Sequence, residues 1–303
     1  MAESGAVPLV DNPDAVDEKP KPKWVIPQHE PRRDISRAKI MVYGPPKIGK
    51  STLASKFPGA LFFDTEEGLD WLECHRVIIS CWDDDKGLTF VKVGNTMVPK
   101  SSFMTFAAHL AEEQPECIPG TEVPLHTLVI DTIDRAFNMC VEHICTINGI
   151  TSPADLEWGK GWKLVGDEWT RVITKMASWP YGLMMTSHDK QTKIKSQATE
   201  IDLIQPSIAT TGRRVVQALC DIILYCYTSE VAEVNDNNEL TGRVTEQRVM
   251  RCQPKNNIIA GDRSGYLPVE MPLNYDKLVE YFPDTPGTTS TPQDSPATPK
   301  SGG

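Results

Sequence analysis

The segment best suited to chemistry is Gly44-Pro-Pro-Lys-Ile-Gly-Lys-Ser51, which matches the pattern GxxxxGK[ST] at every fixed position. It follows an apolar run at 39–43 and precedes a segment of helical character, the context of a phosphate-binding P-loop. Glycine lets backbone N–H groups turn toward an anion, while a lysine and a serine hydroxyl can serve the phosphates and Mg²⁺. The pattern predicts an ATP site, against the alternative of a Gly-Pro turn before a helix. The expected nucleotide contacts are Gly44, Pro45, Pro46, Lys47, Ile48, Gly49, Lys50, Ser51 and Thr52.

A carboxylate for the metal is expected at the end of a second apolar run. The run at 125–131 ends in Asp131, roughly eighty residues beyond the P-loop, where a partner aspartate is normally found. We expect Asp131 to hold Mg²⁺ through water, with Ser51 as the second protein contact. Apolar runs that end in Asp are common, so this signal depends on the P-loop. Asp134 is expected to be an acid at a helix start, favoured by the helix dipole.

A third run, at 60–64, is followed by the acidic turn Asp64-Thr-Glu-Glu-Gly68. Because it comes directly after the P-loop helix, its carboxyl end should face the nucleotide. A carboxylate near the γ-phosphate can orient the attacking water. The alternative is a solvated acidic turn in an acidic chain.

The elements that position these residues alternate between short apolar runs and longer mixed segments, which is typical of a parallel sheet covered by helices. We therefore expect an α/β fold with a mostly parallel, twisted sheet flanked by helices. The ends are poor in apolar residues, so residues 1–33 and 284–303 are expected to be disordered tails around a domain at 34–283. Strands are expected at 39–43, 60–64, 127–131, 182–187, 220–227 and 243–252, and helices at 50–57, 133–148, 161–179, 211–219 and 275–282.

The charge balance limits the possible partners. The 303 residues carry 31 Lys and Arg against 41 Asp and Glu, a formal net charge of -10, so any nucleic-acid contact requires a local basic patch. No signal peptide or apolar run of about 18 residues is present, which predicts a cytoplasmic protein without membrane contact. The eight cysteines are expected to be reduced core thiols, with a zinc site as the minor alternative.

The turn Phe62-Phe-Asp-Thr-Glu-Glu-Gly-Leu-Asp70 resembles the segment after the second core strand of RecA-fold recombinases. In those proteins a glutamate at the position of Glu66 is the catalytic base. In AAA+ proteins the acidic residue instead follows the metal-binding aspartate, whereas here Thr132 follows Asp131. From about residue 35 to 282 the chain resembles phage-encoded RecA-like ATP-binding proteins that include Sak-type single-strand annealing proteins. Two further segments, at 158–162 and 250–263, carry this likeness.

The resemblance implies a RecA-like P-loop NTPase core and several further roles. His188 occupies the place of a residue that senses the γ-phosphate, although many recombinases have glutamine there and a histidine could simply bind the strand end. The segment after it corresponds to a DNA-binding loop, against the alternative of a solvated polar loop. Its expected DNA contacts are Lys190, Lys193, Lys195, Arg213 and Arg214.

Two smaller sets of residues have alternative interpretations. Trp158 and Trp162 lie near Lys160 and Lys163 and could stack on bases, although tryptophans at this spacing are more often core. Cations after the last long strand, Arg251 and Lys255, could reach the γ-phosphate bound by a neighbouring subunit, with Arg263 as a third candidate. The alternative is a surface hairpin whose cations balance local acids.

Together these features predict a Mg²⁺-dependent, DNA-stimulated ATPase of phage recombination that binds single-stranded DNA and promotes annealing. Its expected state is a homo-oligomer, ring or filament, in the host cytoplasm, with a phage single-strand binding protein as a possible partner. One alternative is a helicase loader or recombination mediator with an indirect DNA role. A nucleotide kinase ranks last, because the sequence has no arginine-rich lid and no small-substrate pocket signature.

Overall fold

The computed structural model describes residues 27–195, 200–234 and 240–287. The chain divides into two units, 1–32 and 33–303, and the second contains every helix and strand described below. Most residues of the two predicted tails lie outside the described residues. Thr285, which we predicted to lie in the C-terminal tail, is buried, and its Oγ1 accepts a hydrogen bond from the Ile35 backbone N–H at 3.1 Å. The folded unit therefore extends beyond residue 284.

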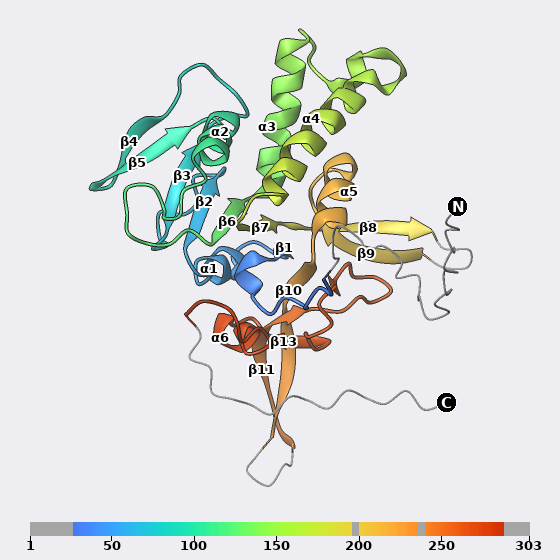
Figure 1. Cartoon of the computed structure of the whole chain (residues 1–303). Helices are drawn as coiled ribbons and strands as arrows, with labels where there is room; N and C mark the ends of the chain where they lie inside the picture. The colour runs from blue at the N-terminus through green and yellow to red at the C-terminus, as the bar shows by residue number, and fades with distance from the viewer. Residues whose placement is uncertain (1–26, 196–199, 235–239, 288–303) are drawn as a thin grey trace, which may run out of the picture. The chain divides into compact units, whose positions relative to one another are not determined.

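An 11-stranded sheet forms the centre of this unit in the described part of the chain (Figure 1). Its six central strand pairs are parallel, and the outer pairs are antiparallel. The order is β13 (Glu270–Pro272), β11 (Leu240–Arg251), β10 (Ile222–Val234), β1 (Lys39–Tyr43), β7 (Gly182–Ser187), β6 (Thr127–Asp131), β2 (Ala60–Asp64), β3 (His75–Ile79), β5 (Thr96–Ser101) and β4 (Thr89–Val93), with β12 (Gly261–Asp262) paired to β10.

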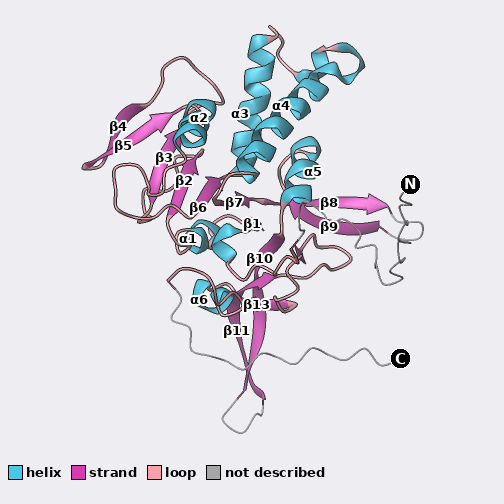
Figure 2. Cartoon of the chain, viewed as in Figure 1, coloured by secondary structure: helices cyan, strands magenta, loops and turns pink. Residues whose placement is uncertain are grey.

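Helices cover both faces of the sheet (Figure 2). One face packs against α2 (Phe103–Glu113), α3 (Ile133–Ile147), α4 (Lys160–Ala177) and α5 (Thr210–Leu219). The other packs against α1 (Lys50–Ala54) and α6 (Tyr275–Val279). Strands β2, β6 and β7 are buried along their whole length, as expected when both faces are covered. The predicted mostly parallel α/β core of a P-loop NTPase is confirmed.

The structure differs from the sequence-based expectation in its more polar regions. The sequence predicts no regular element at 75–113, yet this segment forms β3, the β4–β5 hairpin and α2. The predicted DNA loop is an antiparallel pair, β8 (Asp189–Lys195) and β9 (Glu200–Pro206), followed by α5. Both hairpins lie at or outside the sheet edge, so their strands bury few side chains and lack the apolar runs that mark the central strands. Helices α1 and α6 are each three residues shorter than predicted.

No helix among the described residues is long and apolar enough to cross a membrane.

Candidate nucleotide site

The P-loop follows β1 at the carboxyl edge of the sheet. A Cβ on Gly44 would lie 2.2 Å from the Cys226 carbonyl oxygen of β10, so only glycine fits there. Gly49 and Lys47 have φ of 119° and 63°, which bends the loop into the conformation the motif requires. The buried Lys50 ammonium donates to the carbonyl oxygens of Gly44 at 2.8 Å and Pro45 at 2.9 Å. Burial lowers its pKa. Of the predicted contacts 44–52, residues 44–49 thus form the loop and residues 50–52 begin α1, with the Lys50 ammonium directed back to the loop carbonyls.

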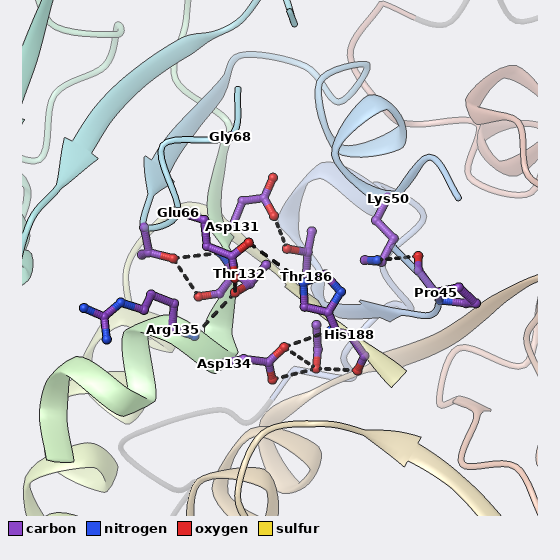
Figure 3. Close-up of polar contacts among 12 residues, drawn as sticks. Pro45, Lys50, Glu66, Gly68, Asp131, Thr132, Asp134, Arg135, Thr186 and His188 are labelled. Atoms are coloured by element: carbon purple, nitrogen blue, oxygen red, sulfur yellow. Dashed lines mark hydrogen bonds and ion pairs between the residues drawn. The ribbon is translucent and has the colours of Figure 1, made fainter. Parts of the chain in front are cut away.

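The acidic turn after β2 is fastened to the strand end that carries Asp131. The Thr65 backbone N–H donates to the Asp131 carbonyl at 2.9 Å, and the Thr65 hydroxyl exchanges hydrogen bonds with the Thr132 backbone at 2.8 and 3.0 Å. The Thr132 hydroxyl then donates to Oε1 of Glu66 at 2.7 Å. The turn therefore directs the Glu66 carboxylate toward the carboxyl edge of β6 (Figure 3).

The other two acids of this turn have different partners. Asp64 is buried, pairs with Arg76 at 2.7 Å and accepts from the Gly68 N–H at 3.3 Å. Burial raises the pKa of Asp64, and the Arg76 guanidinium opposes that shift. The backbone of Glu67 is left-handed, with φ 55°, and its carboxylate lies 3.6 Å from the Lys100 ammonium on β5. Asp64 thus holds the turn in place, and Glu67 points toward another strand.

Asp131 is buried at the end of β6, and its Oδ1 accepts from the Thr186 hydroxyl of β7 at 2.5 Å. Ser51, at the start of α1, is partly exposed. Carboxylate and hydroxyl oxygens are the hard ligands that Mg²⁺ prefers, and this ion usually takes few protein ligands beside phosphate and water. The residues present therefore fit a nucleotide-bound Mg²⁺. Among the described residues, no group of three His, Cys, Asp or Glu side chains could hold a metal alone.

His188 lies between the acidic turn and α3. Its Nε2 is 3.8 Å from Oε2 of Glu66, and its buried Nδ1 has no hydrogen-bond partner among the described residues. Its backbone N–H donates to Asp134 at 2.8 Å, and the Ser187 hydroxyl donates to the same carboxylate at 2.8 Å (Figure 3). Asp134 begins α3 as predicted, but it is more than a helix-dipole acid, because it fastens the end of β7. Burial raises its pKa.

The predicted DNA contacts divide between two elements. Lys190 and Lys193 are exposed on β8, and Arg214 is exposed on α5. The side chain of Lys195 lies outside the described residues. Arg213 folds back onto its own chain, where its guanidinium donates to the Ile208 carbonyl at 3.2 Å and to the Thr210 hydroxyl at 3.3 Å. Three of the five predicted contacts are therefore available on the surface.

The cations proposed to act across a subunit interface also differ in their surroundings. Arg251 is mostly buried and pairs with Glu270 of β13. Arg263 pairs with Asp221 at 3.4 Å, next to the start of β10, at the edge of the sheet opposite the P-loop. Lys255 is exposed in a loop that hydrogen-bonds to β9 through Ile204. Lys255 alone of these combines exposure with a place near the carboxyl edge.

Trp158, in the α3–α4 connection, and Trp162, in the first turn of α4, are exposed, at 99% and 40% respectively. The alternative that they belong to the core is wrong for Trp158. This residue lies within the short 3-10 helix η3 (Glu157–Gly159), which follows η2 (Pro153–Asp155), and its backbone is left-handed, with φ 57°.

With this geometry in view, comparison with known families shows which class of P-loop protein this is. The sequence profile of the family described as "AAA domain" matches residues 36–264, more than half of the chain. The chain belongs to this AAA-type P-loop ATPase family. A search of curated proteins finds no match. The prediction of a nucleotide-binding P-loop ATPase is thus confirmed at the level of the family.

The candidate nucleotide site contains several residues that the sequence analysis missed. Thr65, Thr132 and Thr186 position Glu66 and Asp131 through their hydroxyl groups, and Arg76 holds the acidic turn. The available signal was the threonine that directly follows each strand-terminal aspartate, Asp64 and Asp131.

Proposed function

We propose that this ATPase hydrolyses Mg-ATP with Glu66 as the general base. The observation that carries the proposal is the fixed Glu66 carboxylate, held 2.7 Å from the Thr132 hydroxyl on the strand end that also carries Asp131. One carboxylate oxygen is thus occupied by a hydrogen bond. The other, Oε2, lies 3.8 Å from Nε2 of His188, and in this proposal it accepts a proton from the water that attacks the γ-phosphate.

Other residues have supporting roles in this proposal. Lys50 binds the β- and γ-phosphates, and Ser51 and Asp131 hold the magnesium ion, which neutralises charge that develops on the phosphate oxygens. His188 lies within reach of both Glu66 and the γ-phosphate region, and it can sense whether the site holds ATP or ADP. Its backbone contact with Asp134 connects that position to the start of β8.

The second part of the proposal is single-stranded DNA binding in phage recombination, with strand annealing as the outcome. It is supported by Lys190, Lys193 and Arg214, which are exposed cations in an acidic protein. Trp158 and Trp162 offer exposed aromatic faces beside Lys160 and Lys163. In this proposal a homo-oligomeric ring or filament forms in the host cytoplasm, where it can cooperate with a phage single-strand binding protein.

The experiment measures ATP turnover with and without single-stranded DNA, together with annealing of complementary oligonucleotides. We expect turnover that requires Mg²⁺, rises with DNA and accompanies faster annealing. Turnover that is insensitive to DNA, without annealing, would favour a helicase loader or recombination mediator. Turnover that appears only when a nucleoside monophosphate is added would favour a kinase.

A further inference from the structure

Arg248 lies beside the P-loop although it is nearly two hundred residues away in the sequence. It belongs to β11, two residues before the buried Met250, so both side chains project from the sheet face that α1 covers. The Arg248 Nη1 atom is 3.8 Å from the point where a Cβ on Gly49 would stand, and the Leu273 Cδ2 atom is 3.4 Å from it.

Arg248 and Leu273 form one wall beside the loop. The Leu273 backbone N–H donates to the Arg248 carbonyl at 2.9 Å, which holds the residue after β13 against β11. The Arg248 side chain is exposed, and within the described part of the chain its guanidinium makes no ion pair. Its guanidinium therefore stands next to the phosphate-binding loop.

The order of the strands separates the residues of the candidate site into two groups, one on each side of β1. The strands that carry Asp131, Glu66 and His188 lie on one side of β1, and β10, β11 and β13 lie on the other. If the γ-phosphate lies beside Glu66, the α-phosphate and nucleoside can extend to the other side of β1, toward β11. This step rests on the proposed function.

We propose that Arg248 binds the α-phosphate of the nucleotide in the same chain, with Leu273 in apolar contact with the sugar or base. The guanidinium presents several N–H donors in a planar fork that matches the oxygens of a phosphate group. The α-phosphate is present in both ATP and ADP. Arg248 therefore contributes to the affinity for both nucleotides, in contrast to residues that meet only the γ-phosphate.

Calorimetric titration of the full chain with Mg-ADP and with the β,γ-imido analogue of ATP tests this assignment. A charged hydrogen bond to phosphate is typically worth enough that Arg248→Ala should raise both dissociation constants about tenfold or more. Arg248→Lys should recover part of the affinity. Gln247→Ala is the matched control, since Gln247 is the adjacent exposed residue of β11 and faces away from Arg248. Thermal unfolding of each variant confirms that it is folded.

The outcomes separate this inference from the proposed function. Weaker binding of the ATP analogue with unchanged ADP binding would place Arg248 at the γ-phosphate and overturn the inference. An equal loss in Gln247→Ala, or no loss in Arg248→Ala, would overturn it as well while leaving ATP hydrolysis by Glu66 intact. If the wild-type protein binds neither nucleotide, the proposed function itself fails.

Discussion

At the scale of single residues, the neighbouring glutamates of the turn after β2 have different partners. Glu66 accepts a hydrogen bond from Thr132 on the strand of Asp131, whereas Glu67 lies 3.6 Å from Lys100 on β5. The left-handed backbone of Glu67 directs the two side chains apart. Position on the turn, rather than residue type, thus decides which carboxylate can meet the attacking water.

Glu66→Gln should lower the turnover of ATP by about two to four orders of magnitude, because the amide cannot accept the proton of water. Binding of Mg-ATP should stay near the wild-type value, since the glutamine keeps the size of the side chain. Glu67→Gln is the matched control and should have a much smaller effect. The opposite ranking of the two variants would transfer the role of base to Glu67.

Lys50→Ala should abolish ATP turnover and strongly weaken nucleotide binding, because it removes the ammonium group that meets the β- and γ-phosphates. Turnover assays and nucleotide titration measure both effects. Circular dichroism must show a folded variant, since the buried Lys50 also donates hydrogen bonds to the loop carbonyls of Gly44 and Pro45. A folded variant with wild-type turnover would mean that the P-loop is not the site of hydrolysis.

At the scale of elements, the β8–β9 hairpin and the following helix α5 begin near the carboxyl edge of the sheet, where the candidate nucleotide site lies, and they carry exposed cations. The Ser187 hydroxyl accepts from the Ser207 backbone N–H at 3.2 Å and donates to Asp134 at 2.8 Å. The base of the hairpin is thus fastened to the start of α3, which directly follows the strand end at Asp131. The exposed lysines of β8 extend from this fixed base.

Replacing Lys190, Lys193 and Lys195 with alanine should lower the affinity for single-stranded DNA of every sequence alike. For each phosphate group that the variant no longer binds, the slope of log affinity against log salt should flatten by roughly 0.7. Fluorescence anisotropy across a salt series measures the slope. Lys92→Ala is a suitable control, because this exposed lysine lies on β4 at the far edge of the sheet. A slope that does not change would place the DNA elsewhere.

The packing of α5 against α3 makes a prediction about stability. A Cβ on Gly212 would lie 2.5 Å from the buried Phe137 ring, so Gly212→Ala overpacks the interface. Overpacking costs about 1–3 kcal/mol, of which alanine regains up to about 1 kcal/mol over glycine in a helix. After this gain is subtracted, urea denaturation should show a free energy of unfolding lower by up to about 2 kcal/mol.

The control for this measurement is Gly261→Ala in β12, where an added Cβ meets nothing within 4 Å. We expect its free energy of unfolding to stay within about 0.5 kcal/mol of the wild type. An equal loss in both variants would show that packing against Phe137 is not the cause.

At the scale of the whole molecule, the question is whether the ATPase site is shared between subunits. Arg251 is engaged with Glu270 in its own chain, and Arg263 lies near the opposite edge of the sheet. Lys255 is exposed in a loop beside β9. Among the three, the surroundings therefore favour Lys255 as the cation that could reach a neighbouring γ-phosphate, where it would oppose the charge of the transition state.

If Lys255 acts across an interface, Lys255→Ala should be inactive alone and regain part of its turnover when mixed with Lys50→Ala. A mixed interface can pair an intact P-loop with an intact lysine, so activity returns at a fraction of the sites. Arg251→Ala and Arg263→Ala, mixed in the same way, serve as comparisons. Full activity of all three variants alone would contradict a shared site and favour a monomeric ATPase.

The sequence by itself determined the phosphate loop, the strand-terminal Asp131 and the mostly parallel α/β core, because these depend on local patterns. Glycines with fixed spacing and continuous apolar strands can be recognised in the sequence without knowing which other segments they contact. The tertiary structure alone decided that Thr132 holds Glu66, that Arg213 folds back, and that Arg248 stands beside Gly49. These contacts join residues of different strands and loops. They depend on the order of the strands in the sheet and on the directions of side chains. Neither of these two properties produces a repeating pattern of residues in the sequence.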